Sequence, residues 1–287
     1  MKTVAVLGAG AMGSRMVKRL IAGGQRTVVY NRTAERAQAL AGEGAVLART
    51  PRDAAASADV VISMVTDDVA SRALWLDAAD GAAAGLRPGA LAIESSTLSP
   101  GWVRELGAAL GARGAHFLDA PVVGSRPQAD GGALIYLVGG AAEHVAAARE
   151  LLASMGAAVH HVGPTGSGAL LKLAVNAIFG CQAAVLAEVL GIVRRAGLDV
   201  PEVVKLLSAL PVTSASMQGV GAQIASQTFT PLFPISLVEK DFRYVLELAR
   251  AVQAAAPSCR VAHELFADAD RKGYGGDNIS GIAKCFL

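Results

Sequence analysis

The sequence predicts an α/β domain over residues 1–163, followed by an all-α domain over residues 164–287. Three observations indicate this arrangement. Up to about residue 163, short β-branched runs alternate with helix-like segments, which is typical of a parallel sheet with helices on both faces. The runs are apolar almost throughout, as in strands that are covered on both faces. Beyond that point only longer helical periods remain, and 287 residues suit about two domains.

The expected elements follow in chain order. Strands are expected over residues 4–7, 27–30, 60–64, 91–94 and 134–138, with 115–118 and 159–162 as further candidates. Helices are expected over residues 12–22 and, in the second domain, over 168–196, 200–210, 236–256 and 259–272. Gly197 is placed to end the first helix of the second domain, and Pro201 falls in the first turn of the next one.

The composition excludes several classes of protein. Hydrophobic residues make up 53% and charged residues 17%, which excludes a disordered chain. Lys and Arg total 26 against 24 Asp and Glu, with no basic tract, so neither nucleic acid nor an anionic membrane is an expected partner. The three cysteines are odd in number and lie in helix-like segments, which indicates reduced thiols in a cytoplasmic protein, and they lack the C-x-x-C spacing of a structural zinc site. His160 and His161 would face opposite sides of a strand, so no metal site is expected.

Two apolar stretches bear on membrane insertion. Residues 4–11 contain glycines that suit a strand and turn better than a signal peptide. Residues 170–193 are long enough to span a bilayer. They carry polar side chains whose burial in lipid would be costly, namely Lys172, Asn176, Gln182 and Glu188. A buried core helix is therefore the expected structure.

A glycine-rich turn follows the first expected strand and opens the first helix. The residues Gly8, Ala9, Gly10, Ala11, Met12 and Gly13 fit the pattern G-x-G-x-x-G. Gly8 permits the tight turn, Gly10 lets the main chain approach a pyrophosphate, and Gly13 lets the helix pack closely on the strand. Free N–H groups at the helix start would bind the phosphates. The context predicts a Rossmann-type dinucleotide-binding domain rather than a turn without a ligand.

The end of the second strand indicates which dinucleotide is bound. NAD enzymes usually have Asp or Glu here, to accept a hydrogen bond from the ribose 2′-hydroxyl. This chain has Asn31, Arg32 and Thr33 instead. Arg32 can pair with a 2′-phosphate and Thr33 can donate a further hydrogen bond, while neutral Asn31 does not repel it. NADP is therefore favoured over NAD, and the alternative is that Arg32 is simply a solvated surface residue.

Lys172 and Asn176 lie four residues apart on the apolar helix and so share one face. A buried lysine is rare without a partner or a chemical task. Burial and a nearby nicotinamide cation both lower the pKa of an amine, which suits proton transfer near neutral pH. A second interpretation is that Lys172 extends to the helix edge and Asn176 satisfies a main-chain group. The residues alone leave both open.

Six segments in order resemble the β-hydroxyacid dehydrogenases, a family that includes 3-hydroxyisobutyrate dehydrogenase, tartronate semialdehyde reductase and glyoxylate/succinic semialdehyde reductases. They are residues 8–13, 62–66, 94–100, 119–125, 166–176 and 240–241. The fourth is similar to D-A-P-V-S-G-G and the fifth to G-x-G-x-x-x-K-x-x-x-N. The resemblance covers nearly the whole chain and favours a function for Lys172.

The resemblance implies roles for the substrate-facing residues. Lys172 would be the general acid/base, and Asn176 would orient the substrate. Gly124 and Ser125 would line the site of the substrate carboxylate.

It also implies further contacts with the cofactor. Val65, Thr66 and Thr97 would lie along the cofactor between its pyrophosphate and its nicotinamide. Lys240 would close over the cofactor from the helical domain, with Asp241 beside it.

Two positions depart from the family pattern. Val123 stands where the family commonly has Ser, which removes a hydroxyl expected to bind the substrate carboxylate. Ser125 or Arg126 would have to compensate, unless the substrate is larger or less acidic. Glu94 replaces the usual Asp. The stretch from Arg126 to Asp130 is closer to the glyoxylate reductases, which also favour NADP.

The sequence thus predicts an NADP-dependent oxidoreductase that acts on CH–OH groups. It would transfer a hydride between nicotinamide and a small β-hydroxy acid, or a semialdehyde or 2-oxo acid. An imine reductase is an alternative that Lys172 disfavours and Val123 keeps open. A non-catalytic NADP-binding sensor or scaffold is another, which Lys172, Asn176 and Thr97 together disfavour. A homo-oligomer is expected; its size, the exact substrate and the reaction direction stay open.

Overall fold

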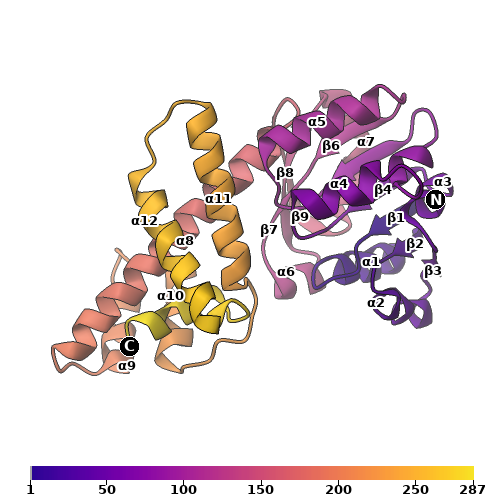
Figure 1. Ribbon diagram of the computed structural model, residues 1–287. Helices are drawn as coiled ribbons and strands as arrows, with labels where there is room; N and C mark the ends of the chain where they lie inside the picture. Colours follow the sequence, from indigo (N-terminus) through magenta and orange to yellow (C-terminus); the bar gives the residue numbers. More distant parts are fainter. Residues whose placement is uncertain (1) are drawn as a thin grey trace. The chain divides into compact units, whose positions relative to one another are not determined.

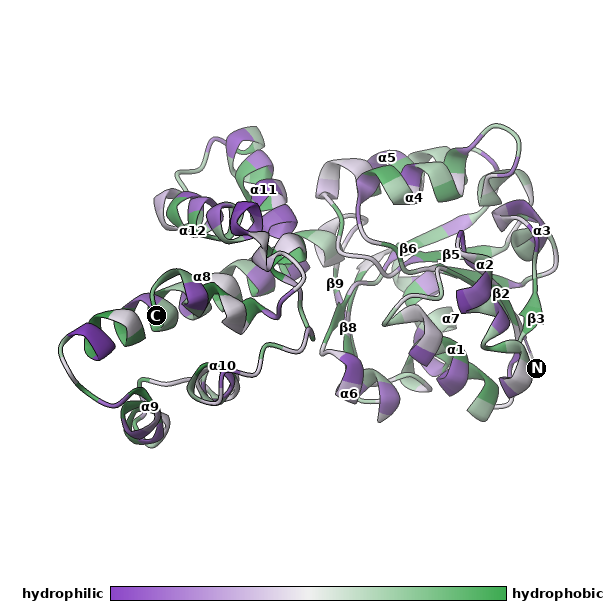
Figure 2. Ribbon diagram, turned by 60° about the horizontal axis from the view of Figure 1, so that its bottom comes forward, coloured by the Kyte–Doolittle hydropathy of each residue, from purple (hydrophilic) through white to green (hydrophobic). Residues whose placement is uncertain are grey.

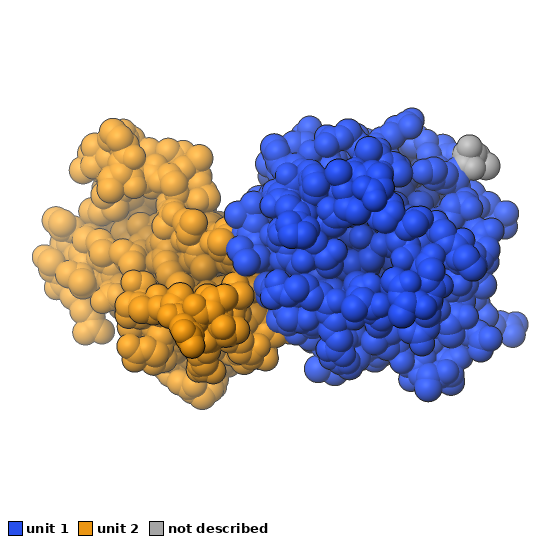
Figure 3. All heavy atoms as spheres, turned by 90° about the horizontal axis from the view of Figure 1, so that it is seen from above, with its two compact units in different colours: residues 1–172 blue, residues 173–287 orange. Residues whose placement is uncertain are grey.

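The computed structural model describes residues 2–287, which divide into two compact units at residues 172 and 173 (Figures 1 and 3). The first unit holds a nine-stranded sheet with the order β3-β2-β1-β4-β5-β6-β8-β7, and β9 pairs with β8. The strands are β1 (Thr3–Leu7), β2 (Arg26–Tyr30), β3 (Val46–Leu47), β4 (Val60–Ser63), β5 (Leu91–Glu94), β6 (His116–Asp119), β7 (Val122–Val123), β8 (Leu134–Gly140) and β9 (Gly156–Gly163).

Seven helices of the first unit lie between these strands in the chain. They are α1 (Gly13–Ala22), α2 (Ala34–Gln38), α3 (Pro51–Ala56), α4 (Asp68–Leu76), α5 (Pro100–Gly111), α6 (Arg126–Asp130) and α7 (Ala142–Ala153). Short 3-10 turns cover Ala41–Glu43 and Ala82–Ala84. Helices flank the sheet on both sides, so the α/β architecture is confirmed (Figure 2).

The side chains of β1 point alternately to the two faces of the sheet, and each face is covered by a layer of helices. Side chains at successive positions of a strand point to opposite faces. Val4 and Val6 join the core cluster formed with α1 and α7, whereas Ala5 and Leu7 join the cluster formed with α3, α4 and α5. All four side chains are buried, which is why this strand is apolar at every position.

The expected strands of the first unit are all present, but not all of them are parallel. Strands β1 to β6 pair in parallel, as predicted. Strand β8 runs antiparallel to β6 and to β7, because the chain returns through the short helix α6 rather than through a long crossover. Strands β3 and β7, of two residues each, were not expected and are too short for a periodic signal.

The second unit is all-helical, as predicted. Helix α8 (Ser167–Arg195) enters it, followed by α9 (Val200–Ser208), α10 (Ala215–Ala225), α11 (Ile235–Ala251) and α12 (Pro257–Ala269). A π-helical turn at Asp270–Tyr274 and a 3-10 helix at Ile279–Cys285 complete it. Helix α10 was not expected, because its alanine- and glycine-rich sequence has little helical periodicity. Gly197, just after α8, has a φ of 89° and ends that helix.

Helix α8 is long and apolar enough to cross a membrane by length and composition. One face is buried in the core of the second unit through Ala183, Ala187 and Leu190. Green residues along the helix in Figure 2 are interrupted by purple ones. The buried face is what the sequence predicts for a core helix.

Candidate active site

The glycine turn after β1 has the geometry of a phosphate cradle. Gly8 has a φ of 105°, and a Cβ atom there would lie 2.3 Å from the carbonyl oxygen of Met64. A Cβ at Gly13 would lie 1.8 Å from the carbonyl oxygen of Gly8, so helix α1 can start only with glycine there. At Gly10 a Cβ would meet nothing within 4 Å, which leaves open space beside the main chain. These residues therefore fit a dinucleotide pyrophosphate.

The end of β2 is tied to this turn. The Oδ1 atom of Asn31 accepts a hydrogen bond of 2.8 Å from the N–H of Ala9, and its Nδ2 donates to the carbonyl of Thr33 over 2.8 Å. The Asn31 side chain therefore holds the glycine turn in place. Arg32 and Thr33 are exposed beside it. Within residues 2–287, Arg32 has no hydrogen-bond or ion-pair partner, so its guanidinium is available to an external phosphate.

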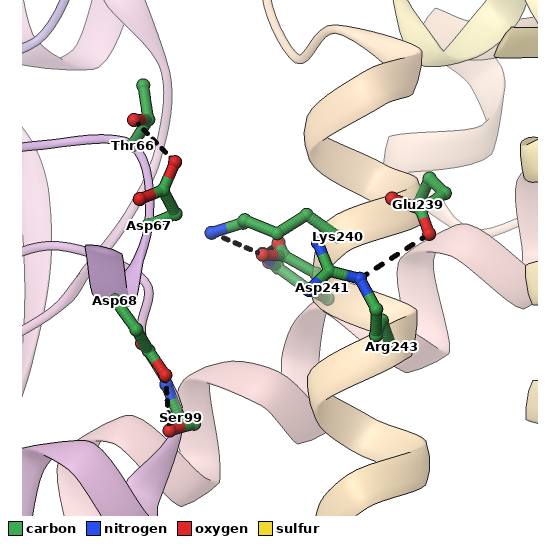
Figure 4. A network of polar contacts seen from close by, with 9 residues as sticks. Thr66, Asp67, Asp68, Ser99, Glu239, Lys240, Asp241 and Arg243 are labelled. Atoms are coloured by element: carbon green, nitrogen blue, oxygen red, sulfur yellow. Dashed lines mark hydrogen bonds and ion pairs between the residues drawn. The ribbon is translucent and has the colours of Figure 1, made fainter. Parts of the chain in front are cut away.

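The loops after β4 and β5 are linked to one another. The N–H of Val65 donates to the Oγ of Ser96 over 2.8 Å. Ser99 donates to Asp68 from both its N–H and its Oγ, over 3.0 and 2.6 Å (Figure 4). Thr66 is exposed, and Thr97 is half-buried in the second of these loops. The two loops thus form one connected edge at the carboxyl ends of adjacent parallel strands, where ligands of such sheets bind.

Glu94 supports these loops from beneath. It is fully buried and accepts hydrogen bonds from Ser71 Oγ, Trp75 Nε1 and the N–H of Ser96, over 2.7 to 3.0 Å. A glutamate reaches one methylene farther than an aspartate, which lets the carboxylate contact helix α4. The departure from the family pattern at this position is therefore matched by partners on α4.

Asp119, at the end of β6, fixes the start of α8. Its two carboxylate oxygens accept hydrogen bonds from the N–H groups of Gly166 and Ala169, over 2.8 and 2.9 Å. Burial raises the pKa of this carboxyl, and the main-chain N–H groups oppose that rise. A Cβ at Gly168 would lie 2.3 Å from the carbonyl of Leu137, so the helix approaches β8 as closely as glycine permits. Lys172 lies about one helical turn after Ala169, the last residue of α8 that Asp119 contacts.

Lys172 and Asn176 both lie on α8 and are 9% and 7% exposed. The Nδ2 of Asn176 donates to Asp241 Oδ2 over 2.5 Å. The other carboxylate oxygen of Asp241 lies 3.0 Å from Lys240 Nζ, and this pair is buried too (Figure 4). Because a carboxylate can only accept, the Asn176 amide must present its NH₂ to Asp241. Its Oδ1 therefore points away, as an acceptor without a donor among residues 2–287.

The segment after β7 holds the remaining predicted residues. Val123 is half-buried and pairs with Ile135 of β8. Gly124 follows with a φ of 119°, and Ser125 begins helix α6. The predicted cofactor residues of the first unit thus lie at the turn and loops that follow β1, β2, β4 and β5. Lys172 and Asn176 share one helix, and Asn176 is joined to Lys240 through Asp241.

Sequence reasoning missed the supporting roles of Asp119, Asn31 and Glu94. A signal for Asp119 was present, because an aspartate that ends a buried strand is followed in the chain by the glycine-rich helix opening Gly166-Ser167-Gly168. For residues 2–287 no group of three or more His, Cys, Asp or Glu side chains could hold a metal ion.

Two family models together match nearly the whole chain. The model of the NAD binding domain of 6-phosphogluconate dehydrogenase matches residues 3–163. The model of the NAD-binding region of NADP-dependent 3-hydroxyisobutyrate dehydrogenase matches residues 166–286. The chain belongs to the β-hydroxyacid dehydrogenase family. Both models describe NAD-binding regions of dehydrogenases, which supports an oxidoreductase that uses a nicotinamide dinucleotide.

Individual relatives match over almost their whole length. An NAD-dependent L-serine dehydrogenase of Pseudomonas aeruginosa is 32% identical, over 100% of this chain and 98% of its own. An L-threonate dehydrogenase of Cupriavidus necator is 30% identical, over 99% and 96%. The solved 3-hydroxyisobutyrate dehydrogenase of Mycobacterium tuberculosis, with L-serine, is 27% identical over 99% of both chains, with a TM-score of 0.90.

Proposed function

We propose that this protein is an NADP-dependent dehydrogenase or reductase of a small β-hydroxy acid, or of the corresponding semialdehyde or 2-oxo acid. The observation that carries the proposal is the buried Lys172, one helical turn from Asn176 on a helix that Asp119 anchors. The relatives named above act on L-serine and L-threonate, both small hydroxy acids, which supports this substrate class.

Lys172 is the proposed general acid/base. In reduction its ammonium group donates a proton to the substrate oxygen as the alkoxide develops, and in oxidation the neutral amine accepts the hydroxyl proton. The bound nicotinamide supplies or accepts the hydride. Asn176 Nδ2 carries two N–H groups; Asp241 accepts from one, and the other donates a hydrogen bond to the substrate oxygen while Lys172 gives or takes the proton. This arrangement positions the oxygen that gains or loses the proton.

Arg32 supports NADP as the preferred cofactor. It is exposed at the end of β2, next to the glycine turn, and no carboxylate occupies the position that usually accepts from the ribose 2′-hydroxyl. The comparisons include both cofactors. One relative is named as NAD-dependent, and one family model is named for an NADP-dependent enzyme.

The cofactor preference is tested by Arg32→Asp. We expect kcat/KM for NADPH to fall by ~10²-fold or more, because a charge-assisted pair is replaced by repulsion, while kcat/KM for NADH changes little. Arg26→Gln, an exposed arginine at the opposite end of β2, is the matched control. An unchanged NADPH preference in the Arg32 variant would contradict the assignment.

The reaction itself is tested with a panel of glyoxylate, succinic semialdehyde, 3-hydroxy acids and cyclic imines, each run with NADPH and NADH. We expect turnover of a hydroxy acid or its carbonyl partner. Val123 keeps the imine reductase alternative open, because an imine needs no carboxylate site, whereas Lys172 argues against it. Turnover restricted to imines would replace the proposed reaction, and NADPH binding without any turnover would support a sensor or scaffold.

A homo-oligomer is proposed from the exposed face of α8. Ile178, Val185 and Ile192 are spaced seven residues apart, so they form one stripe, and they are about 60% exposed. Burial of such a stripe against a second copy would be favourable. Light scattering of the wild type and of Val185→Asp tests this; a monomeric wild type would contradict it.

A further inference from the structure

We propose that Arg126 binds the acid group of the substrate, in place of the hydroxyl that Val123 removes. The inference rests on the proposed function and names the substrate feature that the site selects: a carboxylate, held by a guanidinium rather than by a serine.

Arg126 differs from the other arginines that lack a protein partner. In the described part of the chain, the remaining arginines with neither a hydrogen bond nor an ion pair are all exposed, namely Arg26, Arg32, Arg36, Arg49, Arg52, Arg104, Arg195, Arg250 and Arg260. Arg126 alone is partly buried, and its Nε is a buried donor without an acceptor. Leaving a buried donor unsatisfied is costly, more so on a charged group. A guanidinium kept in this state indicates an acceptor that the protein itself does not supply.

The position of Arg126 within the first unit suits a ligand. Strand β6 ends at Asp119, on the same edge of the parallel sheet as the glycine turn and the loops after β4 and β5. Strand β8 pairs with β6 only at its far end, so its start, with β7 beside it, extends beyond this edge. Arg126 follows directly after β7, in helix α6. The residue therefore lies on the ligand-binding side of the sheet.

Helix α6 is also fixed against the glycine turn. Arg15 Nε lies 2.9 Å from Asp130 Oδ2 at the end of α6, and Arg15 Nη1 donates to the carbonyl of Ala11 in the turn over 2.7 Å. Arg126 is one helical turn before Asp130. The contact of Arg15 thus places the helix that carries Arg126 beside the exit of the dinucleotide turn.

The chemistry of the segment requires a new donor. Val123 is half-buried and has no polar side-chain atom, so it offers nothing to a carboxylate. A guanidinium presents a rigid fork of N–H donors that matches a carboxylate through two parallel hydrogen bonds, and it stays charged at every physiological pH. Replacing a neutral hydroxyl by this fork strengthens selection for an anionic substrate over a neutral one.

The test compares two aldehydes of the same chain length, succinic semialdehyde and butanal, with NADPH. In Arg126→Gln we expect kcat/KM for succinic semialdehyde to fall ~10- to 100-fold, as for loss of a hydrogen bond to a charged group, with butanal unchanged. Arg126→Lys should lie between Gln and the wild type, because it keeps the charge and loses the fork. Arg26→Gln, an exposed arginine at the start of β2, should leave kcat/KM for both aldehydes unchanged.

Two outcomes would overturn the inference. If the ratio of kcat/KM for the two aldehydes is the same in Arg126→Gln as in the wild type, the acid group is bound elsewhere. A higher KM for NADPH with the same ratio means that Arg126 serves the cofactor.

A binding measurement separates this inference from the proposed function. Calorimetry of the NADP⁺-loaded protein with 3-hydroxypropionate, and with 1,3-propanediol as the neutral control, needs no turnover. We expect the wild type to bind the acid at least ~10-fold more tightly than Arg126→Gln does, and the diol equally in both. A wild type without turnover that still shows this difference refutes the reaction and keeps Arg126 as the acid-binding residue. Equal binding of the acid to both proteins refutes the role of Arg126.

Discussion

The two units hold their polar groups by different means. In the first unit the side chains of Asn31 and Asp119 accept hydrogen bonds from main-chain N–H groups, and so fix the glycine turn and the start of α8. In the second unit a buried side-chain ion pair, Lys240 with Asp241, holds the amide of Asn176. The first arrangement should therefore be sensitive to added volume, and the second to lost charge.

The largest effect is expected from loss of charge in the second unit. Asp241→Ala removes the carboxylate beside the buried Lys240 ammonium and leaves the Asn176 amide without its acceptor. Breaking a buried pair from one side costs about 3–5 kcal/mol, so the free energy of unfolding should fall by about that amount in urea denaturation. A decrease below ~1 kcal/mol would contradict the role of this carboxylate.

A double variant sharpens that result. In Lys240→Met with Asp241→Leu both members of the buried ion pair are gone, and such replacements of a buried pair by apolar side chains are often neutral. Stability should recover in part, since only the Asn176 amide stays unsatisfied. Turnover should not recover, because Asn176 loses the carboxylate that orients it.

The first unit should be sensitive to added side-chain volume. Two glycines of the same turn allow the effect on stability to be measured separately from the effect on NADPH binding. Gly13→Ala places a Cβ 1.8 Å from a carbonyl oxygen, so we expect a loss of ~2 kcal/mol or more in the free energy of unfolding. Gly10→Ala meets nothing within 4 Å, so stability should hold while NADPH affinity is lost. Thermal unfolding and NADPH titration measure both. Equal effects of the two substitutions on stability would contradict the geometry.

The smallest effect concerns the pH response of a thiol in the second unit. Burial, with the neighbouring Cys259 thiol, raises the pKa of Cys181 from 9.0 to about 11. A thiol with a raised pKa in the folded state binds its proton more tightly than in the unfolded state, so stability is lost as the pH rises above 9. Cys181→Ser should flatten this loss, and alkylation of Cys181 by iodoacetamide should still accelerate between pH 9 and 11. A labelling rate that levels off near pH 9 would contradict the raised pKa.

Periodicity and turn chemistry predicted most of the fold. The strands of the first unit and the helix α8 carry long, regular patterns, and both were identified. The direction of β8 was not, because a strand's sequence does not encode whether its neighbour runs parallel to it. Helix α10 and strands β3 and β7 were missed because they are short or low in apolar contrast.

The sequence alone suggested candidate site residues, but not the side chains that hold them in position. The glycine turn, Arg32 and Lys172 follow from local patterns. The orientation of the Asn176 amide depends on Asp241, which is 65 positions away, and the anchoring of α8 depends on Asp119, which lies 47 positions before Gly166. Contacts over such separations exist only in the folded chain.

The central claim is that Lys172 moves the proton. It is tested most directly by kcat of Lys172→Ala on whichever substrate the panel identifies, together with the Kd for NADPH. We predict a fall in kcat of ~10²- to 10⁴-fold, as is typical for loss of a positioned acid or base, with NADPH affinity unchanged. A Lys172→Ala variant that turns over at the wild-type rate would contradict the account.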